Sequence, residues 1–173
     1  SKTIKSDGDE SAFGLARKML TLAAVFMAGL TLIGILIAPL LVRIMAMGWT
    51  AEEQIEFTVL LSRIIYAFIG LISLAALVMG ILNAKGVFFV PAIASSAFNL
   101  GSIISGAWIG YQIDPCWGRG ALIGFAIGVL IGGLCQLLVQ LPALRKIGFR
   151  FWLDFNWKDP GVKKVLGLMG PAI

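Results

Sequence analysis

The chain has no histidine, only two cysteines and few charged residues. Histidine is the side chain that most often serves as general base or metal ligand near neutral pH. Cys116 lies in a polar segment and Cys135 in an apolar one, a placement that matches no zinc or redox motif and disfavours a disulfide. The apolar stretches also contain no carboxylate pair. We therefore expect no catalytic residues, no metal and no cofactor in this chain.

The scarcity of charge excludes an ordinary water-soluble domain. Charged residues make up 13% of the 173 residues and hydrophobic residues 59%. A soluble domain carries about 25% charged and about 45–50% apolar residues. So few charges cannot cover a water-facing surface, so the surrounding medium is predicted to be lipid.

Long uncharged stretches predict helices that cross a bilayer. They occupy residues 19–42, 64–84, 86–113 (with the span itself from about 90) and 120–143. Each has the ~20 residues that a helix needs to cross about 30 Å of hydrocarbon. A further apolar run starts near residue 162 and stops at Ile173, so we expect a piece of a longer polypeptide. The predicted fold class is all-α, a polytopic transmembrane helix bundle.

Local signals predict where the helices begin and end. Thr50 and Glu53 have the spacing of a capping box, which predicts a helix from about Ala51. Residues 83–86 predict a tight link between the second and third spans. Asp159 with a following proline is typical of a helix start.

Prolines add three expectations. Pro91 falls in the first turn of the third span, where its missing N–H costs nothing. Pro39 and Pro142 lie near span ends and are expected to bend or stop their helices.

The basic residues predict an orientation. With residue 1 on the cytoplasmic side, the outside segments hold only Arg43, Arg63 and Arg119, and we expect these arginines to flank the spans. The other 11 of the 14 basic residues fall inside: Lys2, Lys5, Arg17, Lys18, Lys85, Arg145, Lys146, Arg150, Lys158, Lys163 and Lys164. The positive-inside rule favours this arrangement.

Aromatic and polar residues alternate in segment 149–157. Such a pattern is compatible with a surface that stacks nucleobases or sugars. The interpretation we favour is an interfacial belt, because aromatic rings are enriched at headgroup depth. We expect no nucleic-acid partner.

Glycines recur every four residues in the fourth span, at Gly120, Gly124, Gly128 and Gly132. This spacing lets a neighbouring backbone approach closely, so we predict helix packing there. Gln136 and Gln140 continue the series, and they either bond neighbouring helices or line a transport cavity.

Two asparagines are the remaining polar candidates. Asn83 is interpreted as a helix C-terminal residue at the interface. Asn99 lies about two turns into the third span, with Ser95, Ser96 and Ser102 nearby. Such residues usually satisfy neighbouring backbone groups. Asn99, Gln136 and Gln140 are the candidate substrate contacts of this chain.

Three segments together resemble the MurJ/MviN family of lipid II flippases. They are residues 80–92 (GILNAKGVFFVPA), residues 132–148 (GGLCQLLVQLPALRKIG) and residues 159–172 (DPGVKKVLGLMGPA). They occur in the family's order and spacing, and the resemblance covers essentially the whole chain. Departures occur at Ala67 and Ser95, where the family often has proline, and at Val87, where it often has a basic residue.

The resemblance implies a fourteen-helix, two-lobed transporter of the multidrug/oligosaccharidyl-lipid/polysaccharide exporter superfamily. The chain would supply helices three to six and the start of seven, in the N-terminal lobe. The implied partners are the undecaprenyl-pyrophosphate-linked peptidoglycan precursor, membrane lipids and the remainder of the transporter, in the bacterial inner membrane. The family's substrate-binding arginines lie mainly on helices that this chain lacks. Alternatives left open are another exporter of the superfamily, for lipid-linked oligosaccharides or for drugs and cations, and a scaffold for cell-wall enzymes.

Overall fold

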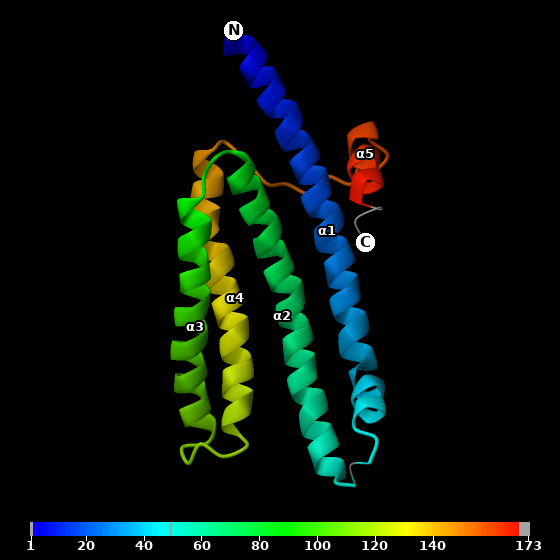
Figure 1. Ribbon diagram of the computed structural model, residues 1–173, viewed down its shortest axis with the longest axis vertical. Helices are drawn as coiled ribbons and strands as arrows, with labels where there is room; N and C mark the ends of the chain where they lie inside the picture. Colours follow the sequence, from blue (N-terminus) through cyan, green and yellow to red (C-terminus); the bar gives the residue numbers. More distant parts are fainter. Residues whose placement is uncertain (1, 49, 170–173) are drawn as a thin grey trace.

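The computed structural model describes residues 2–48 and 50–169, and the regular structure of this part is helical. The helices are α1 (Lys2–Met45), α2 (Glu52–Ala84), α3 (Phe89–Ile113), α4 (Ala121–Lys146) and α5 (Pro160–Met169) (Figure 1). The first four are long and apolar enough to cross a membrane, counting α1 from Ser11. The predicted all-α transmembrane class is confirmed.

The helices α1, α2 and α4 extend beyond the uncharged stretches that predicted them, whereas α3 begins three residues inside its stretch 86–113. The predicted spans 19–42 and 64–84 lie inside α1 and α2, while α3 and α4 begin within one residue of the predicted 90 and 120. A helix can continue beyond its apolar stretch because charged residues such as Lys, Arg and Glu also have good helix propensity. The last part of the predicted fifth helix, residues 170–173, lies outside the described residues.

The tight link that the sequence predicted between α2 and α3 is present. Gly86 has φ +77°, and its N–H donates to the backbone oxygen of Asn83 at 2.9 Å. The N–H of Val87 donates to the backbone oxygen of Leu82 at 2.9 Å. These two bonds form a Schellman motif, in which glycine adopts the left-handed conformation without steric cost. Asn83 lies in the last turn of α2, as predicted.

The predicted capping box at the start of α2 is wrong. The N-cap residue is Ala51, and no side chain caps the helix. Glu53 instead binds Arg119, with 3.0 Å between Oε1 and Nη1. A cation from the α3–α4 loop therefore takes the carboxylate that the capping box needed. At α5 the prediction holds, because Oδ1 of Asp159 accepts from the N–H of Gly161 at 2.7 Å.

Pro39 and Pro142 lie inside α1 and α4, and both helices continue beyond them, so neither proline stops its helix. Proline leaves the carbonyl four residues earlier without its helical donor. For Pro39 that carbonyl belongs to Ile35, and Nε of Arg63 donates to it at 3.3 Å. Arg63 was predicted to lie beside the spans. It lies instead within α2 and contacts α1 inside the apolar stretch 19–42.

The four long helices form an open row. α3 packs extensively on α4, α4 packs on α2, and α2 packs on α1. Among the described residues α1 and α4 make no direct helix contact, and α5 contacts only α1 (Figure 1). After α4 the chain returns across α1 before α5 begins. The row therefore positions the α4–α5 linker, residues 147–159, against α1.

Candidate functional site

Small residues form the contact between α3 and α4. A Cβ atom on Gly124 would overlap the backbone of Gly110, and one on Gly128 would overlap the backbone of Gly106. A Cβ on Gly132 would also overlap α3. The two backbones approach so closely that no side chain fits between them, which makes the pair a rigid unit.

Gly120 lies at a different kind of place from the three glycines that follow it. It is the N-cap residue of α4, and its N–H donates to Oδ2 of Asp114 at 3.2 Å. A Cβ there would lie 3.1 Å from Cβ of Asp114, in the α3–α4 loop. Gly120 therefore packs against the α3–α4 loop, whereas Gly124, Gly128 and Gly132 pack against α3.

Among the candidate substrate contacts, only Gln136 and Gln140 are joined by a hydrogen bond. Gln136 and Gln140 are buried on α4, and Nε2 of Gln140 donates to the backbone oxygen of Gln136 at 3.0 Å. Asn99 is exposed on α3. None of the three lines the cavities described below, so their role in substrate binding stays a prediction.

Arg17 of α1 holds the α4–α5 linker at one end of the row. Its Nε donates to the backbone oxygen of Arg150 at 2.7 Å. Its guanidinium carbon lies 3.4 Å from the ring centroid of Trp152 and 5.7 Å from that of Phe149. Guanidinium stacking on an aromatic face is favourable and strengthens when water is excluded. Phe149 is only 1% exposed, so this ring packs in the core and not in the predicted interfacial belt.

Two further contacts fasten the same linker to α1. The hydroxyl of Thr21 donates to the backbone oxygen of Arg17 at 2.9 Å and accepts from the N–H of Asp154 at 3.1 Å. Lys18 and Asp159 form an ion pair of 2.6 Å. The bond from Lys18, together with the N–H of Gly161, lowers the pKa of the Asp159 carboxyl below its ordinary value. The linker is therefore held to α1 along much of its length.

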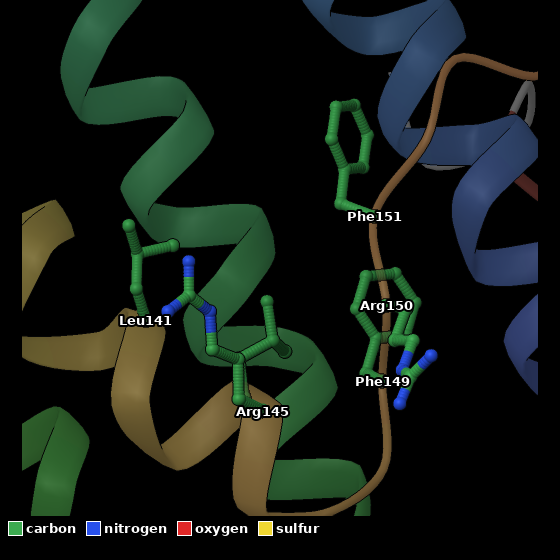
Figure 2. A pocket seen from close by; sticks show the side chains of 6 residues that line it. Leu141, Arg145, Phe149, Arg150 and Phe151 are labelled. Carbon is green, nitrogen blue, oxygen red and sulfur yellow. The ribbon is translucent and has the colours of Figure 1, made fainter.

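A cavity of about 630 Å³ opens beside the linker (Figure 2). Two cationic side chains line it: Arg145 comes from the last turn of α4 and Arg150 from the linker. Its apolar lining comes from Leu141, Leu144, Phe149 and Phe151. A second cavity of about 260 Å³ shares three of these residues and is lined only by apolar side chains of α1, α2, α4 and the linker.

A polar contact also joins two segments at the opposite end of the four-helix row. Arg119 binds the side chain of Glu53 and donates to its backbone oxygen at 2.8 Å. Its guanidinium carbon lies 4.3 Å above the ring of Phe57. This contact joins the α3–α4 loop to the start of α2. Within the described part of the chain, no group of histidine, cysteine, aspartate or glutamate residues could hold a metal ion.

The sequence reasoning missed Arg17, Lys18 and Thr21 as contacts. The sequence marks these residues only as basic residues or as part of a span, and their partners lie 133 to 141 residues away. One signal was present, because Arg17 and Thr21 are four residues apart and share a helix face. That spacing predicts a polar patch but does not identify its partner.

Comparison with known proteins agrees with the resemblance seen in the sequence. The family model "Lipid II flippase MurJ" matches residues 2–173. A protein of Buchnera aphidicola subsp. Acyrthosiphon pisum named "Probable lipid II flippase MurJ" is 33% identical over 171 residues, covering 98% of this chain and 32% of the relative. The "Lipid II flippase MurJ" of Burkholderia cenocepacia is 31% identical over 170 residues, covering 95% of this chain and 32% of that protein.

A third relative is the "Probable lipid II flippase MurJ" of Treponema pallidum, 34% identical over 155 residues, which cover 88% of this chain and 27% of the relative. The chain thus spans about a third of the length of the curated relatives it matches. Because the family model matches nearly every residue and the helices follow the expected order, this chain belongs to the lipid II flippase MurJ family.

Proposed function

We propose that the full-length protein containing this chain carries the undecaprenyl-pyrophosphate-linked peptidoglycan precursor from the inner to the outer leaflet of the bacterial inner membrane. The observation that carries the proposal is the family match over residues 2–173. The proposed activity is transport and not catalysis, in keeping with the flippase names of the relatives.

The proposed placement puts residue 1 on the cytoplasmic side, with α1 to α4 as helices three to six and α5 as the start of helix seven in the N-terminal lobe. The distribution of lysine and arginine supports this orientation, with 11 basic residues on one side and three on the other. The linker clamped by Arg17 then lies at the cytoplasmic margin. The contact between Arg119 and Glu53 lies at the outer margin.

The geometry suits one wall of an alternating-access transporter. A flippase must shield a large polar headgroup from hydrocarbon while the lipid tail stays in the bilayer, and lobes that move as units can do this. The α3–α4 contact excludes side chains, so these two helices move together. The clamp couples the linker between α4 and α5 to α1.

Depletion of the native gene tests the proposal. Spheroplasts of depleted cells are treated with a membrane-impermeant reagent that modifies the lipid II headgroup. The modified fraction should fall, and wild-type protein supplied from a plasmid should restore it. Unchanged modification, with another lipid-linked oligosaccharide retained inside, would assign the protein to a different exporter. Unchanged modification with displaced cell-wall enzymes would make it a scaffold.

A further inference from the structure

The cavity beside the α4–α5 linker combines two cations with an apolar floor. Arg145 comes from the last turn of α4 and Arg150 from the linker, two residues after Gly148, whose φ is +85°. The turn at Gly148 reverses the chain, so the two arginines border one cavity (Figure 2). Arg17 fixes the position of Arg150, because its Nε binds the Arg150 backbone oxygen.

Neither guanidinium is neutralised by the described acidic residues. Both arginines are exposed and form no ion pair within the part of the chain whose side chains are described. Of the two acids in the linker, Asp159 is paired with Lys18, and neither Asp159 nor Asp154 lines the cavity. The mouth of the cavity therefore carries positive charge that is available to an anion.

The floor of the cavity continues into the apolar groove. Leu141, Leu144 and Phe151 line both cavities. Beyond them the groove runs between α1 and α2, with Leu20 and Val78 among its walls. Leu141 lies one turn before Arg145 on α4, so the cation and the start of the groove share one helix face. A ligand that fits both parts needs an anionic head and a hydrocarbon chain.

We propose that this site binds an anionic phospholipid of the surrounding membrane, with its phosphate between Arg145 and Arg150 and one acyl chain in the groove. Arginine presents N–H donors in a fork that matches phosphate oxygens. Basic pockets at the cytoplasmic margin of helix bundles are suited to such headgroups. Free phosphate could use the arginines but would leave the apolar groove unfilled, and for this reason a lipid is the occupant that we assign.

The test uses the full-length protein, purified in detergent and stripped of lipid, with short-chain phosphatidylglycerol as the probe. Native mass spectrometry measures binding to the wild type and to the variants Arg145→Gln, Arg150→Gln and Lys146→Gln. Lys146 is the matched control, because it is exposed beside Arg145 and does not line the cavity. Unchanged helix content by circular dichroism shows that each variant is folded.

We expect each arginine variant to bind phosphatidylglycerol about tenfold more weakly, the loss of one charge-assisted hydrogen bond. The Lys146→Gln variant should bind like the wild type. A fourth variant, Ala24→Phe, narrows the groove and should also weaken binding while both arginines remain. Phosphatidylcholine should bind less tightly than phosphatidylglycerol, and inorganic phosphate should not displace the lipid.

Three results would overturn the proposal. An equal loss in Lys146→Gln would reduce the site to general surface charge. Equal binding of phosphatidylcholine would remove the role of the anion. Displacement by inorganic phosphate, with Ala24→Phe unaffected, would make it a phosphate site without a lipid chain.

Discussion

Arg63 donates a hydrogen bond to the backbone oxygen of Ile35, with 3.3 Å between Nε and O. This is the carbonyl that Pro39 leaves without a donor, because proline has no N–H. Prolines are tolerated in membrane helices when a neighbouring helix supplies the missing donor. Arg63 of α2 therefore compensates for a proline in α1.

A double-mutant cycle tests this compensation. Arg63→Met should destabilise the folded protein by about 1 kcal/mol or more, because the Ile35 carbonyl loses its partner. In a Pro39→Ala background the alanine N–H restores the helical bond, so Arg63→Met should cost much less. Thermal unfolding of the full-length protein in detergent measures both effects. Equal losses in the two backgrounds would mean that Arg63 acts independently of Pro39.

The α3–α4 contact predicts that Gly128 tolerates no side chain. Gly128→Leu forces the backbones of α3 and α4 apart, which we expect to cost about 3 kcal/mol or more and to abolish transport or folding. Gly80→Leu is the matched control, since a Cβ there meets no atom within 4 Å. Growth of cells that depend on each variant, with the amount of folded protein, is the measurement. Normal growth with Gly128→Leu would contradict the packing argument.

The ion pair of Lys18 and Asp159 predicts a dependence on acid. The folded pKa of Asp159 lies below its ordinary value, so the contact is fully present above the ordinary pKa. It is lost as the pH falls through the lowered pKa, that is, below about pH 4. Spin labels at position 14 of α1, where a side chain meets no atom within 4 Å, and at position 158 of the linker should give a narrow distance distribution at pH 7 and a broad one in acid.

Two substitutions separate this effect from general acid unfolding. Asp159→Asn should give the broad distribution already at pH 7. Asp154→Asn should keep the response of the wild type, because the Asp154 carboxylate does not bind Lys18. A narrow distribution in Asp159→Asn at pH 7 would show that the other contacts hold the linker without the ion pair.

The two cysteines report the orientation. Cys116 is exposed in the loop between α3 and α4, and Cys135 is half-buried within α4. With residue 1 in the cytoplasm, a membrane-impermeant maleimide should label Cys116 in intact cells and leave Cys135 unlabelled. The variant Cys116→Ser should abolish the labelling. Labelling of Cys116 only after the cells are opened would reverse the proposed orientation.

Features that depend on neighbouring residues were predictable from the sequence. The long uncharged stretches predicted the four spanning helices, since every backbone polar group in hydrocarbon must be bonded within its own segment. The turn at Gly86 and the start of α5 at Asp159 followed from local backbone chemistry. In each of these features the hydrogen-bonded groups lie within a few residues of one another along the chain.

Features that depend on how helices meet were decided by the tertiary structure. Glu53 could cap its own helix or bind a distant cation, and the packing of α4 beside α2 placed Arg119 within its reach. Arg63 could point toward the membrane surface, and the register of α1 placed an unpaired carbonyl beside it. A polar side chain in or near a membrane takes the partner that desolvation makes most favourable, and only helix packing determines which partner is close enough.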